Sequence, residues 1–137
     1  MWSTNDLAHH RPAVLVVSED VDLRERVVAE LGPVADGDQA HSARFALGRV
    51  YEEAYDGVVV DMDLPQSLAL VRFLAGLDRN MPVVVLASSV TPLTMDELAD
   101  LGASVVLNRS VPVPAMLRVA LIRTLREPHT RQRLAAI

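Results

Sequence analysis

The chain has 137 residues, of which 50% are hydrophobic but only 4% aromatic, and it carries a formal net charge of −5 and no cysteine. That length suits one domain with a core of Val, Leu and Ala. The acidic balance disfavours a nucleic-acid or anionic-membrane surface, and no apolar run approaches the ~20 residues of a membrane span. The lack of cysteine excludes disulfides and thiolate chemistry. We therefore expect a soluble, cytoplasmic domain.

Short Val-rich runs between polar or turn residues predict the strands. The four clear runs are residues 13–17, 57–60, 82–86 and 104–107, and a weaker one lies around residues 34–39. None of the four alternates polar with apolar residues, which is typical of strands that are covered on both faces.

Helical patterns fill the segments between these strands. They span residues 22–31, 41–53, 68–77, 94–101 and 114–126. Their apolar positions are Leu23, Val27, Val28 and Leu31 in the first, Phe45, Leu47, Val50 and Tyr51 in the second, and Leu70, Val71, Phe73, Leu74 and Leu77 in the third. Thr94 and Glu97 have the spacing of a capping box, which predicts that the fourth helix begins at Thr94. Pro114 suits the first turn of the last helix.

Five strand–helix units in succession predict a doubly wound α/β fold, with a parallel sheet between two layers of helices. The five-stranded form is the flavodoxin-like fold with strand order 2-1-3-4-5. In such sheets the ligand crevice lies at the carboxyl ends of the strands. Ser18-Glu19-Asp20, Asp61, Ala87 and Arg109 all follow or end predicted strands, so we expect them at one edge.

Four of these segments, taken in order, resemble the receiver domain of response regulators (CheY-like). They are VLVVSEDVDLR, YDGVVVDMDLP, MPVVVLASS and LGASVVLNRSV. The resemblance covers about residues 12–126 and implies a role in two-component signalling.

In that family the position of Asp61 is the phosphoacceptor for a histidine kinase. The resemblance implies a Mg²⁺ site formed by Glu19, Asp61 and the backbone carbonyl of Asp63. Phosphoryl transfer of this kind depends on positioning and charge stabilisation, so every member of the site matters.

Several of the family's site positions are altered here. Ser18 replaces the first acidic residue, Glu19 is one methylene longer than the usual Asp, and Ala87 replaces a hydroxyl residue. Arg109 stands where the family has Lys, and Val106 where many receivers have an aromatic switch residue. Mg²⁺ demands near-ideal oxygen geometry, so we expect its binding to be weak or absent. The pattern indicates an atypical receiver, or pseudo-receiver.

Two interpretations of Asp61 remain open. In one, Arg109 pairs with Asp61 as a structural ion pair that competes with Mg²⁺. In the other, Asp61 accepts phosphate slowly, Glu19 holds a weak Mg²⁺ and Arg109 replaces Lys. Asp20 has a simpler explanation, because an acidic residue favours the amino terminus of the following helix. Asp63 suits either a solvated loop or the metal site.

The expected function is therefore protein–protein interaction without phosphorylation, and not enzymatic catalysis. We divide the chain into a loose extension (1–12), a receiver-like domain (13–126) and a tail (127–137) that is too short for a DNA-binding module. The apolar region of residues 101–125 is the predicted surface for a protein partner or a homodimer, unless the last helix buries it all. A small flavodoxin-like enzyme or nucleotide-binding domain is a further alternative, although no motif supports it.

Overall fold

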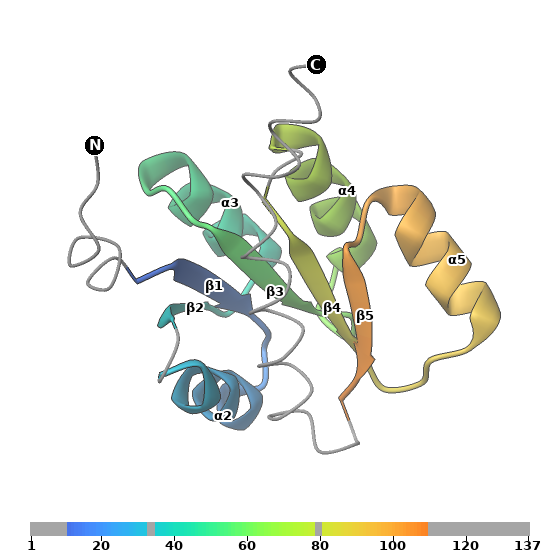
Figure 1. Ribbon diagram of the computed structural model, residues 1–137, viewed down its shortest axis with the longest axis horizontal. Coiled ribbons are helices and arrows are strands. Elements are labelled where there is room, and N and C mark those ends of the chain that lie inside the picture. Colours follow the sequence, from blue (N-terminus) through green and yellow to red (C-terminus); the bar gives the residue numbers. More distant parts are fainter. Residues whose placement is uncertain (1–10, 33–34, 79–80, 110–137) are drawn as a thin grey trace, which may run out of the picture.

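The computed structural model describes residues 11–32, 35–78 and 81–109, in which strands and helices alternate along the chain (Figure 1). The elements are β1 (Ala13–Val17), α2 (Val21–Leu31), β2 (Asp36–Ala40), α3 (Ala43–Glu52), β3 (Gly57–Asp61), α4 (Ser67–Leu77), β4 (Val83–Ala87), α5 (Pro92–Leu101) and β5 (Val105–Asn108). Every expected strand is present, and each clear one lies within one residue of its predicted bounds.

All neighbouring strands pair in parallel, in the order β2-β1-β3-β4-β5. The predicted flavodoxin-like order is thus confirmed. The order changes direction beside β1, where β2 lies on one side and β3 on the other. This is the switch point at which a crevice opens at the carboxyl ends of the strands.

Alternate residues of each strand point to opposite faces of the sheet, and each face has its own apolar core. One core joins Leu15, Val58, Val60, Val83 and Val85 to the inner sides of α3, α4 and α5. The other joins Val14, Val16, Val59, Val84 and Leu86 to α2. Figure 1 shows α2 alone on its side of the sheet among the described helices. Because both faces are covered, β1, β3, β4 and β5 carry apolar runs, whereas β2 at the edge of the sheet is mostly polar.

The start of α5 differs from the prediction. The helix begins at Pro92 with Thr91 as its N-cap, and the Thr91 hydroxyl accepts a hydrogen bond from the backbone N–H of Thr94 at 3.2 Å. The capping box predicted at Thr94 is therefore wrong. Pro92 explains the difference, because proline suits the first helical position, where its missing N–H has no intrahelical partner.

The apolar pattern of α3 also differs from its packing. Phe45 and Tyr51 are exposed, whereas Ala43 and Ala46 are buried against the sheet and Leu47 and Val50 are partly buried beside them. Small side chains let the helix approach the strands closely, and the large aromatic residues then fall on its outer side. The sequence pattern identified the helix but not its buried face.

A polar cluster lies beside the start of β3. The Tyr55 hydroxyl lies 2.8 Å from Asp38 Oδ2 and 3.1 Å from Glu53 Oε2, and Arg49 Nη2 lies 2.8 Å from the same Asp38 oxygen. Burial raises the pKa of Tyr55 above its ordinary value, and the hydrogen bond to Asp38 raises the pKa further. The cluster thus favours the protonated phenol.

Several predictions fall outside the described residues. These are residues 1–10 of the extension, the tail, the helix predicted at 114–126, and the interface predicted at 101–125 beyond Arg109. Within the described residues, no helix combines the length and the apolar character that a membrane span requires.

Candidate functional site

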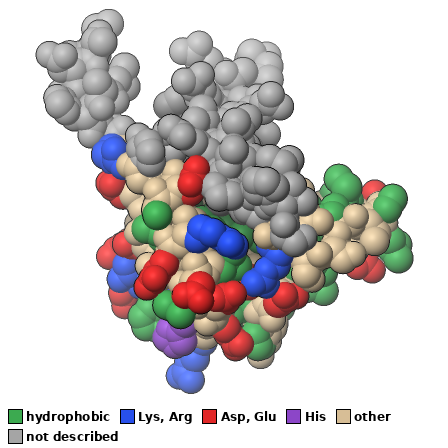
Figure 2. Space-filling model, turned by 90° about the horizontal axis from the view of Figure 1, so that it is seen from below, with side chains coloured by type: hydrophobic (Ala, Val, Ile, Leu, Met, Phe, Trp, Pro, Cys, Tyr) green, Lys and Arg blue, Asp and Glu red, His purple; other side chains and the backbone are tan. Residues whose placement is uncertain are grey.

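The predicted edge residues meet at the carboxyl ends of β1, β3 and β5. Asp61 is the last residue of β3 and is only 3% exposed, and the equally buried Ser18 follows β1. Arg109 directly follows β5, and its backbone N–H donates to the carbonyl of Ala87 at 2.8 Å. Figure 2 views this end of the molecule and shows acidic and basic side chains gathered together.

Asp61 accepts hydrogen bonds on both of its carboxylate oxygens. Its Oδ2 accepts from the Ser18 hydroxyl at 2.6 Å, and its Oδ1 accepts from the backbone N–H of Asp63 at 3.0 Å. Arg109 Nη1 lies 3.1 Å from Oδ1 and 3.3 Å from Oδ2. Each oxygen therefore has two donor contacts, which matches the capacity of an ionised carboxylate.

Arg109 joins three carboxylates from two loops. Its Nη1 lies 2.7 Å from Asp63 Oδ2 as well as 3.1 Å from Asp61 Oδ1, and its Nη2 lies 3.2 Å from Asp20 Oδ2. The predicted contact between Arg109 and Asp61 is present. A single guanidinium nitrogen, Nη1, reaches both Asp61 oxygens, while Nη2 reaches Asp20. The guanidinium thus ties the β1–α2 and β3–α4 loops to the end of β5.

Ser18 has a role that the sequence did not reveal. Besides donating to Asp61, its hydroxyl accepts from the backbone N–H of Asp20 at 3.0 Å. Ser and Thr hydroxyls often accept from the backbone two residues ahead, and that local preference was the available signal. The residue expected only as a missing metal ligand is a buried donor to the central carboxylate.

Asp20 caps α2, in line with the expectation that it favours the amino terminus of the helix. Its Oδ1 accepts from the backbone N–H groups of Asp22 at 3.0 Å and Leu23 at 3.3 Å. Its Oδ2 is the oxygen that contacts Arg109. This second contact was not expected, since the helix alone accounted for the acidic residue.

The central carboxylate of the expected Mg²⁺ site, Asp61, is already engaged by other groups. Glu19 is exposed and has no hydrogen-bond or ion-pair partner among the described residues, and Arg109 contacts the Asp61 carboxylate that a cation would need. No group of three or more His, Cys, Asp or Glu side chains in the described part of the chain is placed to hold a metal ion. The side chains of Glu19, Asp61 and Asp63 therefore do not form a ligand set.

The remaining altered positions are apolar or lie outside the contacts of Asp61. Ala87 is buried at the end of β4, and Val106 packs against the core on the α3–α5 side of the sheet. Ser88 is exposed and does not contact Asp61. The hydroxyl that donates to Asp61 therefore comes from the residue that follows β1 and not from the end of β4.

A second arginine, which sequence reasoning missed, supports the β1–α2 loop. Arg24 Nη1 donates to the backbone carbonyl of Ser18 at 2.6 Å, and Arg24 Nε donates to Gln39 Oε1 at 3.0 Å. Arg24 lies one turn into α2, so it fixes the loop from the helix side. By holding the backbone of Ser18, Arg24 helps to position the Ser18 hydroxyl beside Asp61.

The β3–α4 loop is a compact turn. The backbone N–H of Leu64 donates to the Asp61 carbonyl at 3.0 Å, and the Ser67 hydroxyl donates to the Met62 carbonyl at 2.8 Å. Gln66 has a left-handed φ of 64°, which is costly for a residue with a Cβ. The tight turn places Asp63 within reach of Arg109.

No protein-family model and no curated protein sequence matches the chain. Among solved structures, a CheY-like receiver domain protein from Methanospirillum hungatei JF-1 has a TM-score of 0.81 at 17% identity, covering 89% of this chain and 99% of that one. The BeF3-activated DrrB receiver domain has a TM-score of 0.78 at 19% identity, covering 85% and 99%. CheY4 of Vibrio cholerae has a TM-score of 0.77 at 21% identity, covering 84% and 99%.

Sequence identities this low indicate a shared fold and no more. The strand order and the interleaved helices agree with the fold of those structures. The chain has the fold of a response regulator receiver domain of the CheY-like type.

Proposed function

We propose that the chain is a signalling module of the receiver type that acts by binding a protein partner, without phosphorylation of Asp61. One observation carries the proposal: both oxygens of Asp61 are occupied by donors from Ser18, Asp63 and Arg109. An attacking carboxylate needs a free oxygen directed at the donor phosphorus. Here that oxygen is released only when at least one of these contacts breaks.

Burial strengthens this occupation. Asp61 is 4% exposed by side chain and Arg109 is 20% exposed, so the pair is screened by solvent far less than a surface ion pair. Removing the arginine would leave buried negative charge with only neutral donors, which is costly. The same arginine contacts Asp20 and Asp63, so its withdrawal breaks three ion pairs together.

The residues beside Asp61 also argue against recruitment of a divalent cation. Ser18 contributes a neutral hydroxyl, already hydrogen-bonded to Asp61 and to the backbone N–H of Asp20, in place of a charged carboxylate ligand. The guanidinium already neutralises part of the charge of Asp20, Asp61 and Asp63. A cation would have to displace it against that attraction.

The alternative is an atypical receiver that a histidine kinase phosphorylates slowly on Asp61, with Glu19 holding a weak Mg²⁺. One observation favours it: Asp20 and Asp63 are 46% and 57% exposed by side chain, so their ion pairs with Arg109 are solvated and can open. Arg109 would then stabilise the phosphoryl oxygens in place of Lys.

The experiment is intact-mass measurement after incubation with Mg²⁺ and acetyl phosphate. The wild-type chain is compared with Asp61→Ala and with a Ser18→Asp/Ala87→Thr/Arg109→Lys variant, which restores the family's pattern at those positions. We expect no mass gain in the wild type and a phosphoryl-sized gain in the triple variant, which also controls for hydrolysis during handling. A gain in the wild type that Asp61→Ala abolishes would establish the alternative.

A further inference from the structure

Helix α4 carries an apolar stripe on its outer side in addition to the one that packs on the sheet. Leu68, Phe73 and Leu77 are 41%, 39% and 45% exposed. With Tyr51 of α3 and Leu101 of α5, this side of α4 lines an open groove of about 780 Å³, which we call the α4 groove. Apolar surface gathered in one concavity is typical of a binding site, whereas scattered apolar residues are not.

Two of the few aromatic side chains of the protein lie in the groove and not in the core. The chain has only one Trp, two Tyr and two Phe, yet Tyr51 and Phe73 both lie on this surface. Their ring centroids are 6.2 Å apart with an edge-on arrangement, and Tyr51 is 69% exposed. Exposed tyrosine and phenylalanine beside a groove are typical anchors of protein–protein interfaces.

Gly76 forms a notch in the α4 surface. A Cβ built at Gly76 would have no atom within 4 Å, so nothing in the described chain requires a glycine there. Glycine within a helix costs ~1 kcal/mol relative to alanine. Gly102 shows the contrast, because its φ of 104° and a Cβ position 2.4 Å from the Ala75 Cβ both require glycine. The open space above Gly76 lets another backbone approach α4 closely.

The spacing of the groove residues suits a helix as the occupant. The lining residues of α4 fall on two rows with i, i+4 spacing, namely Leu68-Arg72-Gly76 and Ala69-Phe73-Leu77. Rows of this kind form the ridges between which the side chains of a second helix pack. Amphipathic helices commonly bind in such grooves through residues three and four positions apart.

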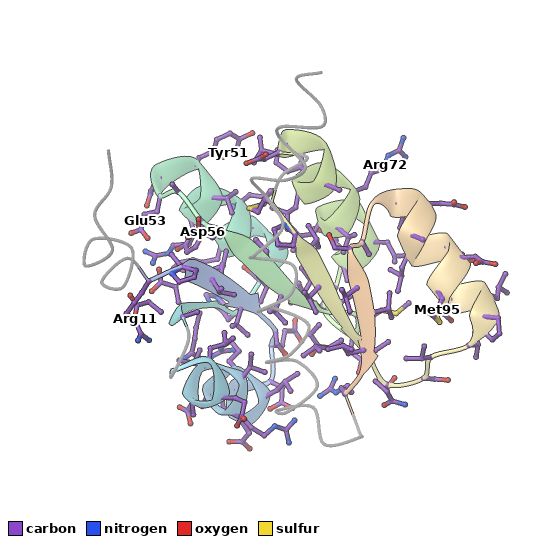
Figure 3. The ribbon with its side chains drawn as sticks, in the orientation of Figure 1. Arg11, Tyr51, Glu53, Asp56, Arg72 and Met95 are labelled. Atoms are coloured by element: carbon purple, nitrogen blue, oxygen red, sulfur yellow. The ribbon has the colours of Figure 1, made fainter. Side chains whose placement is uncertain are left out.

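Arg72 indicates the charge of that occupant. It lies near the middle of the lining segment, and it has no ion-pair partner among the described residues. Figure 3 shows Tyr51 and Arg72 pointing outward on opposite sides of α4. If two copies of the chain packed α4 against α4 in antiparallel fashion, their Arg72 side chains would meet near the two-fold axis and repel. A partner with a carboxylate at that place gains an ion pair instead.

We propose that the α4 groove binds an amphipathic helix of a protein partner, with an Asp or Glu of that helix facing Arg72. The proposal rests on the proposed function, because it specifies the kind of partner that the receiver-type module recognises. The groove begins one residue after the start of α4, and α4 follows the loop that holds Asp63 against Arg109. The ion pair between Arg109 and Asp63 therefore fixes the loop that leads into α4.

The first test uses a displayed library of helical peptides with random outer positions, selected against the wild-type chain and against Arg72→Glu. We expect acidic residues at one helical position with the wild type and basic residues there with the variant. The selected acidic peptide should shift the amide NMR signals of Tyr51, Leu101 and the α4 lining residues. Its affinity should fall about fivefold when the acidic residue becomes Lys. Recovery of no peptide, shifts elsewhere, or no charge preference would each overturn the proposal.

A matched pair of glycine variants separates binding from folding. Gly48 of α3 also has open space at its Cβ position but lies outside the groove, so Gly76→Ala and Gly48→Ala should both stabilise the fold. Only Gly76→Ala should weaken the selected peptide, by at least fivefold. Equal peptide affinities of the two variants would contradict the close approach of the partner helix at Gly76. A concentration-dependent dimer that Phe73→Ser abolishes would instead assign the groove to a second copy and overturn the proposal.

These readouts are independent of Asp61. The peptide titrations contain neither Mg²⁺ nor a phosphodonor, so a negative result here leaves the mass measurement interpretable. Phosphorylation of Asp61 would overturn the proposed function and leave the mapped groove in place. If the groove does not bind a peptide, the proposed function still stands, with the partner bound at another surface.

Discussion

Replacing Ser18 by alanine tests the central contact of the site with little change in shape. The substitution removes only the hydroxyl, so it leaves no cavity of note. It deletes the 2.6 Å bond to Asp61 Oδ2 and the 3.0 Å acceptor for the Asp20 N–H. The loss falls on a carboxylate that is 3% exposed and cannot regain full hydration.

The expected cost follows from these two bonds. A hydrogen bond to a charged group contributes ~1.5–3 kcal/mol, and an orphaned N–H adds ~1 kcal/mol. Arg109 Nη1 already lies 3.3 Å from the same Asp61 oxygen and partly replaces the lost donor. We therefore expect the free energy of unfolding to fall by about 2–3 kcal/mol.

Urea denaturation of the wild type and the variant gives the value. With a slope of ~1–3 kcal/mol per molar urea, the midpoint should fall by about 1 M at unchanged slope. Ser88→Ala is the matched control, because Ser88 is exposed and does not contact Asp61. In an Asp61→Ala background, Ser18→Ala should lower the free energy of unfolding much less, because the hydrogen bond between the two residues is already absent. A loss below ~0.5 kcal/mol in the wild-type background would refute the buried bond.

Three further substitutions test other parts of the account by urea denaturation. Gln66→Gly should stabilise the chain by ~0.5–1 kcal/mol, because it relieves the left-handed φ of 64° at an exposed position; a destabilised variant would contradict that backbone geometry. Gly102→Ala should destabilise it by ~3 kcal/mol, through its positive φ and the Ala75 contact at 2.4 Å, whereas a neutral result would be inconsistent with both. For Tyr55 the folded pKa is raised, so stability is retained below the unfolded value near pH 10 and falls above it by up to ~1.4 kcal/mol per pH unit. Tyr55→Phe should flatten that slope, and an unchanged slope would exclude Tyr55 as its source.

The fold could be predicted because both faces of the sheet are covered. Strands such as Val83–Ala87 are buried on both sides and carry uninterrupted apolar runs, which separate clearly from the amphipathic helices between them. Helix boundaries and buried faces were harder, as α5 and α3 show. Thr91 and Thr94 both have the chemistry of an N-cap, and only the position of Pro92 decides between them.

The sequence predicted which residues meet at the candidate site but not which of their atoms contact each other. The carboxyl-edge rule placed Asp61 and Arg109 together, and the contact is present. The roles of Ser18 and of the second oxygen of Asp20 depend on side-chain directions within a few ångströms, which residue type and spacing do not determine. The substitution pattern marked Ser18 as a missing acid, whereas the geometry makes it a donor to Asp61.

The most direct test of the account is an equilibrium titration that does not depend on the lifetime of a phosphoryl group. Amide NMR signals of Ser18, Asp61 and Asp63 are followed as Mg²⁺ and then beryllofluoride are added to the wild-type chain and to the Ser18→Asp/Ala87→Thr/Arg109→Lys variant. With Asp61 occupied by Ser18 and Arg109, we expect saturable shifts in the variant alone. Saturable shifts of these three amides in the wild type would contradict the account and make the chain a phosphorylation-competent receiver.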